Sequence, residues 1–147
     1  MILRDEAATA RLGATIARGL RAGEAVCLSG PLGAGKSTLA RALVRALTTP
    51  DEEVPSPTFT LVQFYEGPSL KVAHFDLYRL VSAEEAYEIG LDEALDDGAA
   101  VIEWPERLEG QLPPDRLDVE IALRGNGREA RLTPHGSWLG RMKGTAG

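Results

Sequence analysis

Eight consecutive residues, Gly30 to Ser37, have the sequence GPLGAGKS and match the pattern G-x-x-x-x-G-K-[ST] at every position. In such a loop the glycines let backbone N–H groups point inward around an anion, and the N-terminus of the next helix adds partial positive charge. Lys36 is placed to reach the outer phosphates of a nucleotide, and the hydroxyl of Ser37 is placed to hold Mg²⁺. The pattern predicts a site for nucleotide phosphates.

The segments on either side of this loop have the secondary structure that the motif needs. Residues 24–29 form a short apolar run that is typical of a buried strand, and residues 38–47 have the pattern of a helix. A chance match in an ordinary glycine-rich turn would lack this context. Strand, loop and helix together therefore favour nucleotide binding.

Hydrolysis needs groups outside the phosphate loop: a carboxylate for the metal, and a residue that orients the attacking water. Two acids have suitable positions, because Asp76 ends the apolar run 71–75 and Glu103 ends the apolar run 100–102. Ligands of open α/β sheets bind at the carboxyl ends of the strands, which is where these acids are expected. Each acid could instead cap a helix or lie in a loop, and the pattern leaves open which of them contacts Mg²⁺.

Three further side chains have two interpretations each. Thr58 follows a proline-rich loop, where a hydroxyl can sense the γ-phosphate or the metal, but an ordinary strand threonine fits the pattern equally well. His74 is a structural or a positioning residue. It shows no metal-ligand spacing, because the only other histidine, His135, is in a different context. Trp104 is either a packing anchor or a contact for a partner protein.

Composition limits the class of protein. With 147 residues and 44% hydrophobic residues, we expect one domain, residues 1–147, with a real core. The net charge of −6 and pI of about 5.0 argue against a domain that mainly grips nucleic acid, although a partner could supply positive surface for RNA. The single cysteine, Cys27, has no disulfide partner within the chain. Without a signal-like N-terminus or a membrane-length apolar run, we expect a cytoplasmic protein.

The periodicity of the remaining chain predicts an α/β fold. Asp5 is expected to cap a first helix whose apolar positions are spaced by four, and Ser82 with Glu85 resembles a capping box that starts another. The predicted strands are 24–29, 59–65, 70–75, 99–102, 117–123 and 128–133, and the predicted helices are 5–20, 38–47, 82–89 and 91–95. These elements give a mixed central β-sheet flanked by helices, with a β-hairpin at the C-terminal end, as in P-loop NTPases.

Several of these segments resemble the bacterial TsaE (YjeE-type) family of small ATPases. They occur in the family's order and spacing and span nearly the whole chain. The blocks HFDLYRL and EWP, at residues 74–80 and 103–105, are much more specific than the phosphate loop. The other matching segments are residues 5–9, 30–38, 56–62 and 127–131.

The resemblance implies a role in making N6-threonylcarbamoyladenosine in tRNAs that read ANN codons. A family member does not transfer the threonylcarbamoyl group itself. It binds ATP with Mg²⁺ and hydrolyses ATP slowly in complex with the TsaD–TsaB transferase pair, so tRNA would be met indirectly, through that complex. No membrane partner is expected.

The resemblance also implies roles for individual positions. It makes Ser37 and Glu103 the Mg²⁺ positions, with serine in place of the threonine common in the family, and makes Asp76 important for hydrolysis. Lys36, Asp76 and Thr58 are then the expected catalytic residues, with Thr58 in a switch-like loop. The expected nucleotide-binding residues are Glu6, Gly33, Ala34, Gly35, Lys36, Ser37, Thr38 and Arg128.

Two other classes of protein share part of this pattern. A small-molecule kinase has the same phosphate loop, but it usually adds an arginine-bearing lid and an acceptor pocket, for which 147 residues leave little room. A nucleotide-dependent interaction module would dock to a partner when ATP is bound and release it on hydrolysis. A GTPase is disfavoured, because the chain has no N-K-x-D motif. No adenine-reading motif is visible either, so ATP is expected from the resemblance.

Overall fold

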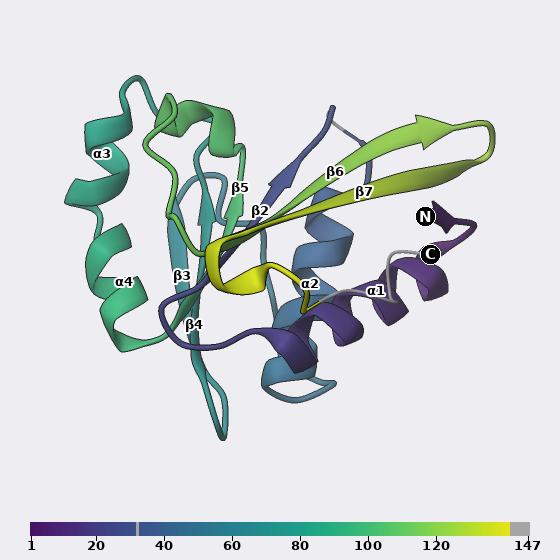
Figure 1. Cartoon of the computed structure of the whole chain (residues 1–147), viewed down its shortest axis with the longest axis horizontal. Helices are drawn as coiled ribbons and strands as arrows, with labels where there is room; N and C mark the ends of the chain where they lie inside the picture. The colour runs from purple at the N-terminus through teal and green to yellow at the C-terminus, as the bar shows by residue number, and fades with distance from the viewer. Residues whose placement is uncertain (32, 142–147) are drawn as a thin grey trace.

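The structure, a computed structural model, describes residues 1–31 and 33–141, so Leu32 of the phosphate loop lies outside the described residues. Its seven strands are β1 (Ile2–Leu3), β2 (Ala25–Ser29), β3 (Val62–Glu66), β4 (Lys71–Asp76), β5 (Ala99–Glu103), β6 (Arg116–Arg124) and β7 (Gly127–His135). They form one sheet in the order β1-β7-β6-β2-β5-β4-β3 (Figure 1). Strand β2 is parallel to β5 and β6, and β4 is parallel to β5, whereas the other pairs are antiparallel. The predicted mixed sheet is confirmed.

Helices cover both faces of this sheet (Figure 1). The α-helices are α1 (Glu6–Gly19), α2 (Lys36–Leu47), α3 (Ala83–Glu88) and α4 (Leu91–Asp97), and two short 3₁₀ helices are η1 (Pro105–Leu108) and η2 (Gly136–Trp138). Helix α1 begins where the sequence predicts, because the carboxylate of Asp5 accepts a hydrogen bond of 2.8 Å from the backbone N–H of Ala8. Its apolar residues Leu12 and Ile16 pack against α2 and the sheet.

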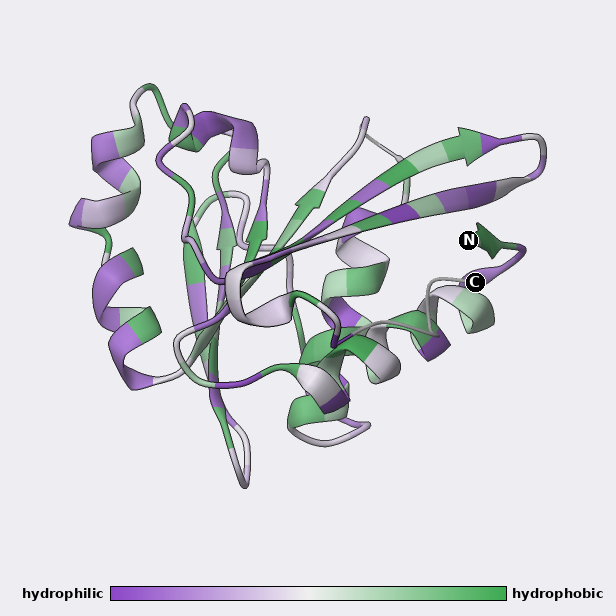
Figure 2. Cartoon of the chain, viewed as in Figure 1, coloured by the Kyte–Doolittle hydropathy of each residue, from purple (hydrophilic) through white to green (hydrophobic). Residues whose placement is uncertain are grey.

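The core has two parts, one on each face of the sheet. Along β2, Val26 and Leu28 pack with the α1 and α2 side, while Ala25 and Cys27 pack with the α3 and α4 side. A strand that is buried on both faces lacks polar alternation, which is why residues 24–29 form a continuous apolar run. Figure 2 shows hydrophobic colouring along β2 and β5 and on parts of the helices. Burial raises the pKa of the Cys27 thiol to about 12, so this cysteine is a core residue and not a reactive one.

Three local predictions differ from the structure. The strand predicted from Phe59 starts three residues later, at Val62, because residues 58–60 form a turn and Leu61 has a φ of 71°. The predicted capping box is not formed: within the described residues the Ser82 side chain makes no capping bond, and the Glu85 carboxylate accepts a hydrogen bond of 3.3 Å from the backbone N–H of Val81, one residue before the N-cap. Strand β1, which pairs with β7, was not predicted, since two residues are too few to show a period.

The sheet brings three chain segments together at the carboxyl ends of its central parallel strands. Strands β2, β4 and β5 run in the same direction, so the loop after β2 and the last residues of β4 and β5 lie together. In this register Asp76 lies directly opposite Glu103. Over residues 1–31 and 33–141, no helix combines the length and apolar character needed to cross a membrane.

Candidate functional site

All three glycines of the loop between β2 and α2 have a positive φ, and two of them show most clearly why glycine is needed. Gly30 has a φ of 141°, and a Cβ there would meet the backbone oxygen of Ile121 on β6. Gly35 has a φ of 105° and directly precedes the first turn of α2. These backbone conformations are open to glycine and strained for other residues, so the motif's glycines are required by the geometry of the turn.

Lys36 points back into the loop that precedes it. Its side chain is buried, its Nζ donates a hydrogen bond to the carbonyl oxygen of Gly30, and the ammonium lies 3.4 Å from the centre of the Trp104 ring. Burial lowers the pKa of Lys36, while the nearby carboxylates of Glu103, Glu106 and Asp76 oppose that shift. The ammonium is thus held between an aromatic face and acidic groups, in a position from which it can meet an incoming anion.

Glu103 links three elements at the end of β5. Its Oε1 accepts a hydrogen bond of 3.0 Å from the hydroxyl of Ser37 at the start of α2. Its Oε2 lies 2.6 Å from Nε2 of His74 on β4. The Glu103 side chain is 2% exposed, so these two contacts satisfy a carboxylate that water hardly reaches.

Asp76 makes a different set of contacts one strand away. Its Oδ2 accepts from the Thr58 hydroxyl at 3.1 Å, and its Oδ1 accepts from the backbone N–H of Tyr78 at 3.0 Å. The hydroxyl of Thr58 is also 2.7 Å from that of Ser56. The loop of residues 54–58 is therefore tied to the end of β4 by Thr58.

Arg128 connects the C-terminal hairpin to the phosphate loop. Its Nε donates to the carbonyl of Ala34 at 2.9 Å, and its Nη2 donates to the carbonyl of Gly33 at 3.1 Å. Because Arg128 is near the start of β7, next to the Gly125–Asn126 turn, these bonds fix the tip of the hairpin against the loop.

A cavity of about 430 Å³ lies between these groups. Its lining residues come from two sets of elements, which we call its two walls: the loop, α2 and the ends of β4 and β5 on one side, and β1, α1 and the hairpin on the other. Of the residues predicted for the site, those that line it are Glu6, Gly33, Gly35, Lys36, Ser37, Thr38, Thr58, Asp76, Glu103 and Arg128. Ala34 does not: its side chain is buried in the core on the α1 and α2 side, and only its carbonyl takes part, through Arg128.

The cavity also has lining residues that the sequence did not assign. Trp104 is the main one, since its ring contacts Lys36 and packs at 4.9 Å against the ring of Tyr78. Its φ of 60° is unusual for a residue other than glycine. Asn126 and Thr9 line the opposite wall. The EWP block pointed to Trp104 without assigning it to the nucleotide, and Thr9 belongs to the matching segment 5–9 without an assigned role, whereas Asn126 carries no signal in the sequence.

Comparison with known proteins agrees on one family. The family model described as "Threonylcarbamoyl adenosine biosynthesis protein TsaE" matches residues 3–131. The tRNA threonylcarbamoyladenosine biosynthesis protein TsaE of Aquifex aeolicus is 40% identical over 134 residues, which cover 90% of this chain and 93% of that protein. The protein of the same name from Treponema pallidum is 38% identical over 127 residues, covering 86% of this chain and 93% of that protein.

The fold agrees with a solved structure as well. The crystal structure of Bacillus subtilis YdiB is similar with a TM-score of 0.80 and 26% sequence identity, and the alignment covers 99% of this chain and 91% of that one. The match to the family extends from β1 into β7, so it includes both walls of the cavity. The chain therefore belongs to the TsaE family.

Proposed function

We propose that this chain binds ATP with Mg²⁺ in the cavity and hydrolyses ATP slowly, in support of N6-threonylcarbamoyladenosine formation in tRNAs that read ANN codons. The observation that carries the chemistry is the hydrogen bond between Ser37, in the phosphate loop, and Glu103, at a neighbouring strand end. The pathway is carried by the relatives from A. aeolicus and T. pallidum, which are tRNA threonylcarbamoyladenosine biosynthesis proteins by name.

The loop and Lys36 would bind the phosphates. Backbone N–H groups at the start of α2 favour an anion, and the helix dipole adds to the effect. The ammonium of Lys36 now donates to the carbonyl of Gly30, and a phosphate oxygen would be a stronger, charged acceptor for it. Binding of a polyphosphate would thus give the buried ammonium a counter-ion.

The oxygen groups beside the loop suit magnesium. Ser37, Thr58, Asp76 and Glu103 all offer oxygen, and the described residues contain no cluster of three or more His, Cys, Asp and Glu side chains that would bind a metal without a ligand. Mg²⁺ typically takes one or two protein oxygens and fills its octahedron with water and substrate phosphates. Ser37 and Glu103 would hold it. When bound, the ion neutralises charge on the phosphate oxygens during transfer.

Asp76 is the best-placed residue to orient the attacking water. Hydrogen bonds from Thr58 and from the backbone of Tyr78 hold its carboxylate in one orientation. Each carboxylate oxygen accepts more than one hydrogen bond, so Asp76 can also accept one from water in the cavity. Without nucleotide, the hydroxyl of Thr58 would hold the carboxylate of Asp76 in place. When nucleotide binds, the same hydroxyl would turn to the γ-phosphate or the metal.

A nucleotide-dependent interaction with the TsaD–TsaB transferase pair is the second part of the proposal. Phe59, the residue after Thr58, is 83% exposed, and Val81 after β4 is 87% exposed. The guanidinium of Arg79 lies 4.8 Å from the centre of the Phe59 ring. Aromatic and arginine side chains are typical anchors of protein interfaces, and these adjoin the loop that contacts Asp76. Nucleotide state in the cavity could therefore control how this surface meets the pair.

Reconstitution tests the function. Purified chain, the TsaD–TsaB pair, threonylcarbamoyl donor, tRNA and ATP should give repeated rounds of tRNA modification, and omission of the chain should stop modification after few rounds. The variant Lys36→Ala should abolish ATP turnover and fail to replace the parent chain. Lys71→Ala is the matched control, because Lys71 is exposed and pairs with Asp97 at 3.1 Å outside the cavity. Full hydrolysis by Lys36→Ala would show that the loop is not the active site.

A further inference from the structure

We propose that His74 is a positioning residue that fixes the carboxylate of Glu103 for magnesium. The inference rests on the proposed function, since it takes Glu103 to be a magnesium carboxylate. Nε2 of His74 lies 2.6 Å from Oε2 of Glu103, and each of the two side chains is 2% exposed. No other pair of ionisable side chains in the described residues is buried so completely on both sides.

The sheet register explains how His74 reaches Glu103. Strands β4 and β5 are parallel, with His74 opposite Val101 and Asp76 opposite Glu103. Side chains two residues apart on a strand share a face, so His74 and Asp76 point to the same side of the sheet as Glu103. The imidazole ring thus approaches the carboxylate from the preceding pair on the same face of the sheet, two residues earlier on each strand, and His74 does not line the cavity.

The two oxygens of Glu103 are divided between two donors. Oε1 accepts from the Ser37 hydroxyl, and Oε2 faces His74. An ionised carboxylate only accepts hydrogen bonds, so Nε2 of His74 carries the proton in this contact. The terminal torsion of a glutamate side chain is only weakly restrained by its own covalent structure. The bond to His74 therefore fixes the plane of the carboxylate and with it the direction in which Oε1 meets Ser37.

The burial of His74 argues against a role as core filler. Its other ring nitrogen, Nδ1, is buried, and the described residues offer it no hydrogen-bond partner. A buried polar atom without a partner is unfavourable, and an aliphatic residue such as Val72, on the same face of β4, would avoid it. The hydrogen bond to Glu103 offsets this cost. Residues that are hydrogen-bonded to a metal ligand, without touching the metal, commonly fix the orientation of that ligand.

Two isosteric variants separate this role from a structural one. The amide nitrogen of Gln overlays Nε2 of a histidine, whereas the shorter Asn amide overlays Nδ1, so His74→Gln keeps a donor for Glu103 and His74→Asn does not. Calorimetry with a non-hydrolysable ATP analogue gives the affinity with Mg²⁺ and with EDTA. We expect His74→Asn to lose about ten-fold or more of the gain in affinity that Mg²⁺ provides, with unchanged affinity in EDTA, and His74→Gln to keep most of that gain.

The control is Val72→Ala, which loosens the same face of β4 without touching Glu103, and should keep the full gain from Mg²⁺. An unchanged gain in His74→Asn, or an equal loss in Val72→Ala, would overturn the role of His74. Absence of any gain from Mg²⁺ in the parent chain is a different result: it would overturn the proposed magnesium role of Glu103 itself.

A second measurement needs no change at His74. The chain has only two histidines, so the ring signals of His74 and His135 can be told apart by NMR of the imidazole nitrogens. The Nε2–H signal of His74 should shift when Mg²⁺ is added to the analogue complex, and Glu103→Gln should remove that shift. His135, which pairs with Asp118 at 2.9 Å, is the internal reference. A His74 signal that does not respond to Mg²⁺ would overturn the inference even if His74→Asn did not fold.

Discussion

The carboxylates of Asp76 and Glu103 lie at adjacent strand ends but have different neighbours. Glu103 contacts the Ser37 hydroxyl of the phosphate loop, whereas Asp76 contacts the Thr58 hydroxyl and the backbone of Tyr78. A carboxylate bonded to the hydroxyl that we propose for Mg²⁺ is suited to the ion, and a carboxylate bonded to a loop residue is suited to the attacking water. Replacing each carboxylate by the corresponding amide should therefore affect two different properties: Mg²⁺-dependent ATP binding for Glu103 and the rate of hydrolysis for Asp76.

We expect Glu103→Gln to weaken Mg²⁺-dependent ATP binding by about ten-fold or more, and Asp76→Asn to weaken it less. Asp76→Asn should instead reduce the rate of hydrolysis, because an amide is a poorer acceptor for the attacking water. Both variants keep the shape of the side chain. Calorimetry with a non-hydrolysable analogue and a phosphate-release assay give the two quantities, and equal Mg²⁺ affinity in Glu103→Gln and the parent would contradict the assignment.

The contact between Lys36 and Trp104 gives a second prediction. A polyphosphate that draws the ammonium from its position 3.4 Å above the ring would change the surroundings of the indole. We therefore expect ATP to change tryptophan fluorescence, and Trp104→Phe to abolish the change. The only other tryptophan, Trp138, is fully buried away from the cavity and supplies a constant background. A response that survives in Trp104→Phe would show that the signal arises elsewhere.

Among single residues, those of the motif could be predicted from the sequence, but the side chains that they contact could not. Lys36 and Ser37 follow from the pattern, because the motif places an ammonium and a hydroxyl at these two positions for the proposed contacts with phosphate and Mg²⁺. The choice between Asp76 and Glu103 stayed open on the pattern, since a strand-end acid is the same in sequence whichever hydroxyl it meets. Trp104 had no assigned role at the site, because its contact with Lys36 joins residues that are far apart in the sequence.

Among the elements, the C-terminal hairpin has an effect beyond the sheet. Strands β6 and β7 pair over their full length, and Arg128, close to their connecting turn, is hydrogen-bonded to the phosphate loop. The hairpin is joined on its outer edge by β1, which leads directly into α1 and Glu6. One wall of the cavity is therefore built from both ends of the chain.

Arg128→Ala should test this coupling. Loss of the bonds to the carbonyls of Gly33 and Ala34 should leave the loop less ordered, and we expect ATP affinity to fall about ten-fold, equivalent to about 1.4 kcal/mol. The melting temperature should change little, because Arg128 is only half-buried. Arg131→Ala, an exposed arginine on the same strand, should leave affinity unchanged. Equal losses in the two variants would mean that overall charge and not the contact is responsible.

The elements that could be predicted are those with a clear local pattern. Helix α1 and strand β6 follow from periodicity, strands β2 and β5 follow from continuous apolar runs, and the α/β class with a mixed sheet and terminal hairpin is confirmed. The misplaced start of β3 has a local cause, because the backbone bond from Leu61 to the carbonyl of Pro57 closes a turn where the residue types favour a strand. Strand β1 exists only through its pairing with β7, a long-range contact that no local pattern contains.

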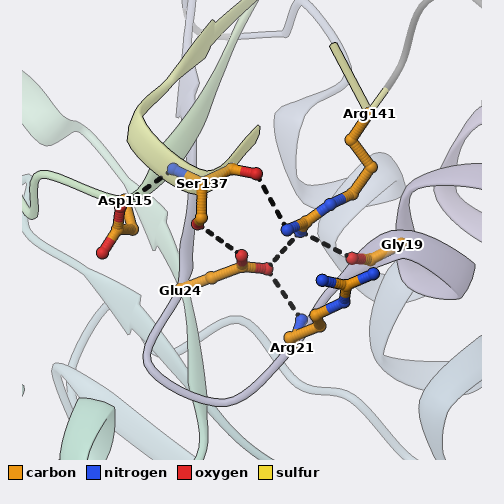
Figure 3. Close-up of polar contacts among 6 residues, drawn as sticks. All are labelled: Gly19, Arg21, Glu24, Asp115, Ser137 and Arg141. Carbon is orange, nitrogen blue, oxygen red and sulfur yellow. Dashed lines mark hydrogen bonds and ion pairs between the residues drawn. The ribbon is translucent and has the colours of Figure 1, made fainter. Parts of the chain in front are cut away.

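For the whole molecule, a polar network around the buried Glu24 joins the last described residues to the start of β2 (Figure 3). The Glu24 carboxylate accepts from the guanidinium of Arg141 at 2.6 Å and also from the hydroxyl of Ser137 and the backbone N–H of Arg21. Arg141 further donates to the carbonyl of Gly19 at the end of α1. The network closes the end of the sheet opposite the cavity, because Glu24 precedes β2 and the phosphate loop follows it.

Because of this network, the free energy of unfolding should decrease as the pH falls into the acid range. Burial alone would raise the pKa of Glu24, but the hydrogen bonds from Arg141, Ser137 and the backbone of Arg21, with the charge of Arg141, outweigh burial and lower it below the ordinary value of 4.5. A carboxylate with a lower pKa in the folded chain contributes stability that is fully present above the unfolded pKa and is lost as pH falls through the folded pKa. The contribution should therefore be complete at pH 7 and fade below about pH 4.5.

Arg141→Ala should reveal that contribution as a difference between two chains. At pH 7 we expect the variant to lose about 2 kcal/mol of unfolding free energy, because Glu24 keeps its burial but loses its charged partner. In acid, where Glu24 is protonated, the gap between variant and parent in urea denaturation should narrow, since carboxylates elsewhere titrate alike in both chains. Glu24→Gln should be milder at pH 7. A gap of equal size at both pH values would mean that Arg141 stabilises the chain by packing on Trp138, 4.7 Å away, and not by its charge.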